Sequence, residues 1–244
     1  LDLLLHETEH GWTSSSDTRE RQAMLPSPPI LKHRAGDSRP EASIRMNSPR
    51  ARSTNTLRII AGHWRSRRLA FPDVEGLRPT ADRIRETLFN WLQERIARED
   101  CLDLFAGSGA CGMEALSRGA RHVTFVDSAS AAASAIRHNL DLLRAEGGEV
   151  VCEDSLRWLQ RQTPPPRYGL VFLDPPFAGD LLVRSATALE ASGLLRDNAL
   201  LYLESAQSLA ALPLPQNWSV LKSRQAGKVH YGLYQRRPPE PLSP

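Results

Sequence analysis

The chain has few cysteines, few lysines and no long apolar run. Its cysteines, Cys101, Cys111 and Cys152, show neither metal-ligand spacing nor a disulfide framework, so we expect no metal site and a reducing, cytoplasmic setting. The apolar start Leu1–Leu5 is interrupted by Asp2 and is far shorter than the ~20 residues that span a membrane. We therefore expect neither a signal peptide nor a membrane segment.

Arginine replaces lysine almost completely. The chain carries 31 Lys and Arg against 28 Asp and Glu, and only Lys32, Lys222 and Lys228 are lysines. Guanidinium groups bind phosphates and stack on unpaired bases, so arginines interleaved with aromatics predict RNA contact; arginine-rich genomic base composition is the alternative. The expected hairpin over Leu57–Phe71 contributes most of the candidates for substrate binding, which are Arg58, His63, Trp64, Arg65, Arg67, Arg68 and Arg78.

The segment Asp174-Pro175-Pro176-Phe177 follows the apolar run Leu170–Leu173, so it should lie where a buried strand ends. Prolines lack N–H donors and fix φ, which lets the Asp174 carboxylate and the Pro175 carbonyl accept the hydrogens of a planar amine in a rigid geometry. Phe177 would stack on an extruded base. The segment predicts a site that holds an amine for methylation, and a proline-stiffened structural turn is the alternative.

A glycine loop lies about seventy residues upstream, between an expected strand at Cys101–Phe105 and an expected helix at Met113–Gly119. Its glycines spell G-x-G-x-x-G, which is the dinucleotide fingerprint, so a hydride-transfer enzyme is one alternative. Glycines also let backbone approach S-adenosylmethionine, because no Cβ intervenes. The residues expected to form this part of a cofactor site are Asp103, Phe105, Ala106, Gly107 and Gly109, with Gly112 completing the pattern.

Acidic residues accompany each of four expected strands. The strand Val123–Val126 ends in Asp127, a carboxylate suited to the two hydroxyls of a ribose. The strand Glu149–Cys152 is followed by Asp154-Ser155, which either meet the adenine amine or cap the next helix. Asp103 either touches the ligand or orients the glycine loop. Ligands of open α/β sheets bind outside the carboxyl ends of the strands, so these acids predict one shared site.

Several stretches, taken together, resemble the RsmD family of 16S ribosomal RNA guanine-N2 methyltransferases, over about Leu57 to Arg236. They are Arg58–Gly62, Leu77–Thr80, Arg83–Leu92, Asp103–Gly109, Asp174–Phe177, Leu203–Ser205 and Ala226–Val229. The resemblance implies a Rossmann-like class I methyltransferase fold, with a mostly parallel seven-stranded sheet, helices on both faces and a small N-terminal β-hairpin. It also implies methyl transfer from S-adenosylmethionine to the exocyclic N2 amine of one guanine in 16S rRNA. Some relatives carry glutamate at Asp127 and asparagine at Asp154.

A helix is expected after Thr80, which would cap it. Its apolar stripe comprises Ile84, Leu88, Trp91 and Leu92, and its polar stripe comprises Arg83, Glu86, Thr87 and Asn90. A solvated face is the alternative for the polar stripe. Under the resemblance, Arg83 would bind the methionine carboxylate of the cofactor, supported by Thr80 or Glu86.

The chain divides into four expected parts. Residues 1–53 form a disordered Arg/Ser/Pro-rich extension, with Met46 as an alternative start, and residues 54–79 form the hairpin and a substrate-contacting segment. Residues 80–237 form the methyltransferase domain, which should close with strands at Ala199–Leu203, Val220-Leu221 and Val229–Tyr234. Residues 238–244 form a disordered tail.

We expect a monomer that acts on rRNA, either naked or within an assembling small ribosomal subunit. An amino-methyltransferase that modifies DNA adenine or a protein glutamine remains an alternative, because the proline turn presents acceptors to any planar amine. A nucleotide-dependent oxidoreductase and a non-catalytic RNA-binding module are the more remote alternatives. Neither of these two would use the proline turn.

Overall fold

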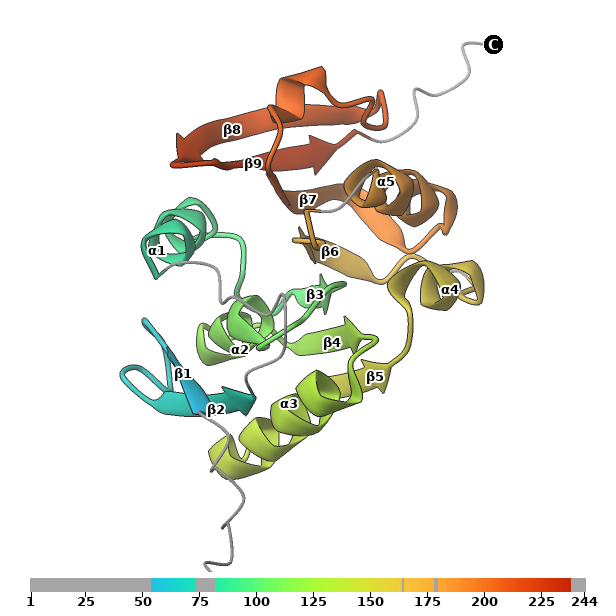
Figure 1. Cartoon of the computed structure of the whole chain (residues 1–244). Coiled ribbons are helices and arrows are strands. Elements are labelled where there is room, and N and C mark those ends of the chain that lie inside the picture. The colour runs from blue at the N-terminus through green and yellow to red at the C-terminus, as the bar shows by residue number, and fades with distance from the viewer. Residues whose placement is uncertain (1–53, 73–81, 164, 178–179, 238–244) are drawn as a thin grey trace, which may run out of the picture. The chain divides into compact units, whose positions relative to one another are not determined.

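The computed structural model describes residues 54–72, 82–163, 165–177 and 180–237. The expectations for residues 1–53 and 238–244, including the start at Met46, lie outside the described residues, as do Arg78 and Thr80. The described residues form a seven-stranded sheet with helices on its faces and a separate two-stranded hairpin (Figure 1). Within the described ranges, every helix is too short or too polar to cross a membrane.

The sheet has the order β5-β4-β3-β6-β7-β9-β8. Its strands are β3 (Asp100–Asp103), β4 (His122–Asp127), β5 (Gly148–Cys152), β6 (Tyr168–Leu173), β7 (Leu195–Ser205), β8 (Trp218–Ala226) and β9 (Val229–Arg236). The first five strands in the spatial order are mutually parallel, and β9 is antiparallel to both of its neighbours. The expected mostly parallel seven-stranded sheet is confirmed.

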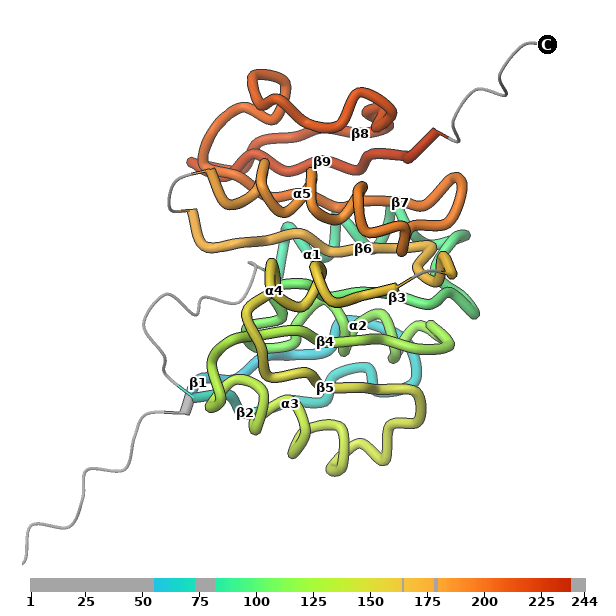
Figure 2. The backbone as a smooth tube through the Cα atoms, turned by 90° about the vertical axis from the view of Figure 1, so that its right-hand side faces the viewer, coloured from blue at the N-terminus to red at the C-terminus, as the bar shows by residue number. Residues whose placement is uncertain are grey.

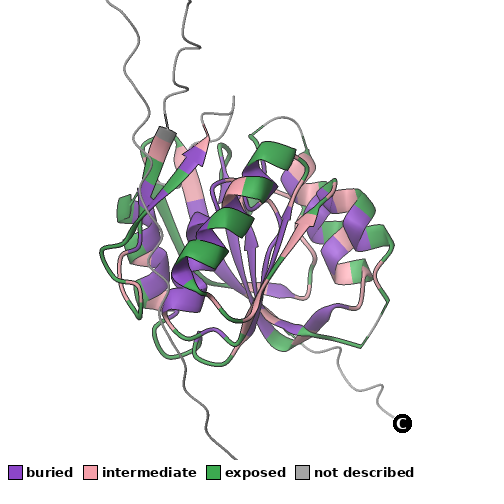
Figure 3. Cartoon of the chain, turned by 90° about the horizontal axis from the view of Figure 1, so that it is seen from below, coloured by how far each residue is buried: buried purple, intermediate pink, exposed green. Residues whose placement is uncertain are grey.

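Helices cover both faces of this sheet. One face carries α1 (Asp82–Trp91), α2 (Ala110–Ser117) and α3 (Ser130–Leu143), and the other carries α4 (Ser155–Gln160) and α5 (Leu181–Ala191) (Figure 1). A short 3-10 helix, η1 (Leu209–Ala211), lies between β7 and β8. Figure 3 shows buried strands between helices that are exposed on their outer sides. Parallel strands covered on both faces read as continuous apolar runs, as at Leu170–Leu173.

The core has two layers because successive side chains of a strand point to opposite faces. Phe172 packs in the layer that includes Phe89 of α1, whereas Val171 packs in the layer that includes Leu189 of α5. Tyr202 of β7 joins the Phe172 layer, and their ring centroids are 6.5 Å apart. Each central strand therefore contributes buried side chains to both layers. This packing on both faces holds the strand, and with it the carboxyl end, in place.

The expected N-terminal hairpin is confirmed. Strands β1 (Thr54–Arg58) and β2 (Arg68–Pro72) pair antiparallel, from Thr54 opposite Pro72 to Arg58 opposite Arg68. Leu57 and Phe71 of the hairpin are buried in the same core layer as α1, α2 and α3. The Asn139 amide of α3 also donates to the Ala70 carbonyl at 3.0 Å. The hairpin is therefore packed against the main domain.

Several strands differ in extent from the sequence-based expectation; β7, expected at Ala199–Leu203, extends over Leu195–Ser205. The strand expected to run to Phe105 ends at Asp103, and Leu104 and Phe105 already turn toward the glycine loop. The strand expected at Val220-Leu221 extends over Trp218–Ala226. It is the outermost strand of the sheet and mostly exposed, so it lacks the alternation of buried and exposed side chains that marks a strand in a sequence.

Candidate cofactor and acceptor site

The carboxyl ends of β3, β4, β5, β6 and β7 lie along one side of the sheet, which we call the carboxyl edge (Figure 2). β3 is the pivot of the strand order, because the chain continues to β4 on one side of it and later returns to β6 on the other. Ligands of open α/β sheets bind at such a switch in strand order. The loops that follow these strands are therefore the candidate site.

The glycine loop joins β3 to α2 at the carboxyl edge. Gly107 and Gly109 have φ values of +54° and +75°, which residues with a Cβ rarely adopt. The Gly107 N–H donates to Asp127 at 2.7 Å, and the Ala129 N–H donates to the other carboxylate oxygen at 2.8 Å. Through these two hydrogen bonds, Asp127 links the glycine loop after β3 to the loop after β4. Its half-buried carboxylate lies where the sequence predicted ribose binding.

Gly112 allows α2 to pack closely against β4. A Cβ at this position would lie 2.2 Å from the Phe125 ring, so α2 approaches β4 only because the side chain is absent. The Gly112 N–H donates to Asp103 at 2.9 Å, which orients the start of α2. The alternative that Asp103 orients the glycine loop is therefore supported, and its contact with a cofactor stays a prediction.

The pKa of the Asp103 carboxyl group is strongly shifted. Burial raises the pKa of Asp103 to about 7, opposed by the Gly112 hydrogen bond, and the charges of Asp174 and Asp127 raise that pKa further. Burial likewise raises the pKa of the Cys111 thiol, and the charges of Asp103, Glu204 and Asp174 add to this effect. These effects show that acids from separate strands share one electronegative region. Such a region fits the positive charge of a sulfonium group.

Asp154 and Ser155 are engaged by the protein itself. The Asp154 carboxylate accepts from the Arg157 N–H at 2.9 Å and caps α4. The buried Ser155 hydroxyl donates to the Leu104 carbonyl at 2.5 Å and so joins α4 to the glycine loop. The capping alternative for Asp154 is confirmed, whereas an adenine contact stays a prediction.

The turn after β6 combines fixed and accessible residues. Asp174 is half-buried and Pro175 is buried, whereas Pro176 is exposed and Phe177 is 52% exposed. A cavity of about 570 Å³ lies beside the turn, within the usual range for small-ligand sites. Besides this turn, its walls include Glu204 and Ser205 at the end of β7. An aromatic side chain therefore lines a cavity beside the half-buried Asp174 and the buried Pro175.

The arginines of the hairpin loop lie apart from these acids. Arg83 is exposed on α1, so its predicted carboxylate contact stays a prediction. The hairpin loop is held at the far end of α2 from the glycine loop: the N–H groups of His63 and Trp64 donate to the carbonyl and hydroxyl of Ser117, at 2.7 and 3.0 Å. Figure 2 shows this loop at the side of the sheet opposite the carboxyl edge. Arg65, Arg67 and Arg68 are exposed there.

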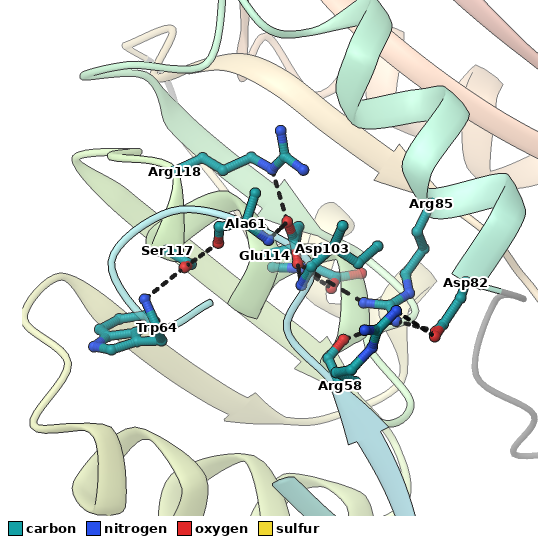
Figure 4. A network of polar contacts seen from close by, with 11 residues as sticks. Arg58, Ala61, Trp64, Asp82, Arg85, Asp103, Glu114, Ser117 and Arg118 are labelled. Atoms are coloured by element: carbon teal, nitrogen blue, oxygen red, sulfur yellow. Dashed lines mark hydrogen bonds and ion pairs between the residues drawn. The ribbon is translucent and has the colours of Figure 1, made fainter. Parts of the chain in front are cut away.

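A buried ionic network was not predicted from the sequence (Figure 4). Glu114 is fully buried in α2 and accepts from the N–H groups of Ile60 and Ala61, at 2.7 and 3.0 Å, and from Arg118 at 2.7 Å. Arg85 of α1 is also fully buried, and its guanidinium lies 4.0 Å from Glu114.

The same guanidinium donates to the Arg58 carbonyl at 3.0 Å and to Asp82 at 2.5 Å. The network therefore joins the hairpin, α1 and α2. Helical spacing could have indicated Arg85, because it lies three and four residues before Leu88 and Phe89, which are buried.

The residues of the carboxyl edge fit a nucleoside cofactor with a sulfonium group. The glycine loop offers backbone without side chains, Asp127 offers a half-buried carboxylate, and the surrounding acids match a positive charge. Among the described residues, no group of three or more His, Cys, Asp and Glu side chains is placed to hold a metal ion.

Comparison with solved structures agrees with this geometry. The structure of yhhF from Escherichia coli, described as a proposed methyltransferase, is 45% identical with a TM-score of 0.68, covering 75% of this chain and 99% of that one. The Thermus thermophilus 16S rRNA N2 G1207 methyltransferase RsmC, in complex with AdoMet and guanosine, is 18% identical with a TM-score of 0.55. That match covers 76% of this chain and 50% of RsmC, and it shows likeness of fold.

The sheet order, the glycine loop and the Asp174–Phe177 turn define a class I methyltransferase. The family described as Conserved hypothetical protein 95 matches residues 57–235. The Ribosomal RNA small subunit methyltransferase D of Escherichia coli K12 is 44% identical over 191 residues, covering 78% of this chain and 96% of that protein. The chain therefore belongs to this family, the RsmD family.

Proposed function

We infer that this enzyme transfers the methyl group of S-adenosylmethionine to the exocyclic N2 amine of a guanine in 16S ribosomal RNA. The observation that carries this inference is the Asp174–Phe177 turn, which contributes the charge of Asp174 to the acidic region around Asp103 and contributes Phe177 to the wall of a cavity of about 570 Å³. The relative that is 44% identical is named for small-subunit rRNA methylation. The 16S rRNA methyltransferase with the same fold holds AdoMet and guanosine.

The cofactor would be held by backbone of the glycine loop and by carboxylates at the strand ends. Asp127 would accept hydrogen bonds from the ribose hydroxyls while retaining those from Gly107 and Ala129, because a carboxylate has about four acceptor positions. When bound, S-adenosylmethionine supplies an electrophilic methyl group on a positively charged sulfur. Asp103 would keep α2 in place beneath the loop through its bond to Gly112.

The acceptor base would lie against the proline turn. The exocyclic amine of guanine is a poor nucleophile, because its lone pair is conjugated with the ring. The Asp174 carboxylate and the Pro175 carbonyl would accept the two amine hydrogens and direct the lone pair toward the methyl group. Phe177, with 52% of its surface exposed, would stack on the flipped base. Catalysis would then come mainly from positioning and from acceptors that face the developing positive charge.

We further propose that the enzyme works as a cytoplasmic monomer on rRNA of the assembling small subunit. The hairpin supplies the candidates for RNA contact on the side of the sheet opposite the carboxyl edge. They are Arg58, His63, Trp64, Arg65, Arg67 and Arg68. Naked 16S rRNA and small ribosomal subunits, compared as acceptors, would decide which of them the enzyme uses.

The direct test is methyl transfer from labelled S-adenosylmethionine to unmodified 16S rRNA, followed by nucleoside mass spectrometry. We expect N2-methylguanosine at one position. Asp174→Ala should abolish turnover and leave cofactor affinity nearly unchanged, whereas Asp141→Ala, which removes an exposed acid of α3, should match the wild type. Label in an adenine or in a protein would refute the substrate, and an Asp174→Ala enzyme of near-native rate would refute the role of the turn.

A further inference from the structure

Residues 205–239 carry positively charged side chains and no acidic ones. No Asp or Glu occurs between Ser205 and Pro239, a stretch that contains two of the three lysines of the chain. Its charged side chains are Lys222, Arg224, Lys228, Arg236 and Arg237. Arg236 pairs with Glu190 and Asp197, at 3.0 and 2.9 Å, but Lys222, Arg224 and Lys228 form no ion pair with the residues that the structure describes.

The strand register places two of these cations, Arg224 and Lys228, near the carboxyl edge, because Arg224 pairs with Tyr231, which lies opposite Glu204 near the end of β7. His230 of β9 lies opposite Ser205, the last residue of β7, and Ala226 pairs with Val229 to close the β8–β9 hairpin. The turn at Gly227-Lys228 is therefore adjacent to Ser205, which lines the cavity. Figure 2 shows the start of β9 and the ends of β6 and β7 at the same side of the sheet.

The turn itself is well defined. Gly227 has a φ of +60°, as tight two-residue hairpin turns require, and its carbonyl accepts from the Gln225 amide at 3.0 Å. Lys228 is exposed at this turn. A fixed backbone therefore holds a cation beside the acceptor cavity.

Arg224 makes an aromatic contact close to this turn, on the face of the sheet that carries α1. Its guanidinium lies over Trp91, 5.9 Å from the ring centroid, and Trp91 stacks on Tyr231 with centroids 5.6 Å apart and an interplanar angle of 23°. Tyr231 is the cross-strand neighbour of Arg224. An exposed guanidinium over a half-buried ring is suited to unpaired nucleotides, because it offers both charge and a flat surface.

We propose that the β8–β9 turn binds the RNA strand that flanks the target guanine, with Lys228 and Arg224 contacting phosphates. This proposal rests on the proposed function, and it assigns the RNA path at the carboxyl edge to an element other than the N-terminal hairpin. The target base in the cavity and the phosphates at the turn would belong to one single-stranded segment. Arg224 would also stack on an adjacent base.

The test compares Arg224→Ala/Lys228→Ala with Arg95→Ala/Arg137→Ala, a control pair that removes the same charge from exposed positions away from the cavity. The readouts are anisotropy with unmodified 16S rRNA transcript at several salt concentrations, the KM for that rRNA, and cofactor affinity by calorimetry. We expect about a tenfold weaker RNA affinity, a higher KM and unchanged cofactor binding. Two lost phosphate contacts on a single strand should also reduce the salt slope by about 1.4.

Arg224→Lys separates the two contributions, because it keeps the charge and removes the flat guanidinium. Retained affinity would support a phosphate contact alone, and partial loss would support stacking as well. Wild-type RNA affinity and salt slope in the Arg224→Ala/Lys228→Ala variant, or equal losses in the control pair, would overturn the proposal. Failure of the proposed function differs from this, since the wild-type enzyme would then bind rRNA without methylating it.

Discussion

Asp103 shows at the scale of one residue how burial and hydrogen bonding compete. Its side chain is almost fully buried and accepts from the Gly112 N–H, which favours the charged form. Burial is the larger effect and raises the pKa to about 7, from an ordinary value of 3.8. The folded protein therefore binds a proton at Asp103 more tightly than the unfolded chain does.

This shift predicts a pH-dependent stability with a defined sign. The folded state holds more protons than the unfolded state between about pH 4 and pH 7, so the contribution of Asp103 to the free energy of unfolding should fall by up to ~1.4 kcal/mol per pH unit in that interval. Urea unfolding of wild type and Asp103→Asn at several pH values measures it. Parallel pH profiles for the two proteins would contradict the shift.

Asp127 carries a different expectation, since its carboxylate is half-buried and accessible. Asp127→Ala should weaken S-adenosylmethionine binding by about 10- to 100-fold, because hydrogen bonds to a charged group contribute ~1.5–3 kcal/mol and the glycine loop also loses its bond from Gly107. Calorimetric titration checks this, with Asp127→Glu expected to retain most of the affinity. An unchanged dissociation constant in Asp127→Ala would refute the ribose contact.

The positions of single residues were predicted well where an acidic side chain directly follows an apolar strand. Asp127 and Asp174 stand at the ends of apolar runs, so their placement at the carboxyl edge followed from the pattern of strands. Glu114 was not predicted, because the two backbone N–H groups that it accepts from belong to a loop more than fifty residues earlier. Separations of that kind leave no local signal.

At the scale of elements, the hairpin depends on Glu114. This carboxylate is fully buried and accepts from two backbone N–H groups of the hairpin loop and from Arg118. Glu114→Gln would replace an acceptor by an amide that can turn an N–H toward those donors. Removing one partner of a buried charge network typically costs ~3–5 kcal/mol.

We therefore expect Glu114→Gln to lower the melting temperature and to speed amide hydrogen exchange in Ile59–Arg67 more than in β3 and β4. Thermal unfolding and hydrogen exchange read by mass spectrometry measure the two effects. Glu94→Gln, at an exposed position, is the matched control. Native exchange rates in the loop of Glu114→Gln would show that the carboxylate does not hold it.

A buried face allowed α1 to be predicted from the sequence, whereas most of β8 was missed because that strand is largely exposed. The apolar stripe of α1 placed that helix correctly, with Ile84, Leu88 and Leu92 buried. The β8 strand was expected to be much shorter, because most of its side chains are exposed and only its pairing with β9 defines it. Hydrogen bonding to a neighbouring strand has no period in the sequence.

At the scale of the whole molecule, RNA and the cofactor should differ in how strongly their binding depends on salt. RNA binding should weaken steeply with salt, since about three phosphate contacts on a single strand give a slope near −2 and roughly a twentyfold loss for a fourfold rise in salt. Cofactor binding should change far less, because the acidic region faces one small ligand. Anisotropy with 16S rRNA and calorimetry with S-adenosylmethionine across the same salt series compare them. Equal slopes would contradict this difference.

The sequence alone determined the class of fold and the chemistry of the site. Strand, glycine loop and helix follow in order, and acids stand at or near four strand ends, so the loops must gather at one edge once parallel strands pair. Which residues lie next to each other across the fold was decided only by the tertiary structure. Packing and register placed Arg65 and Arg67 at the far end of α2 and Lys228 beside the cavity. Contacts of this kind depend on how distant elements meet, and neither periodicity nor a local motif records that.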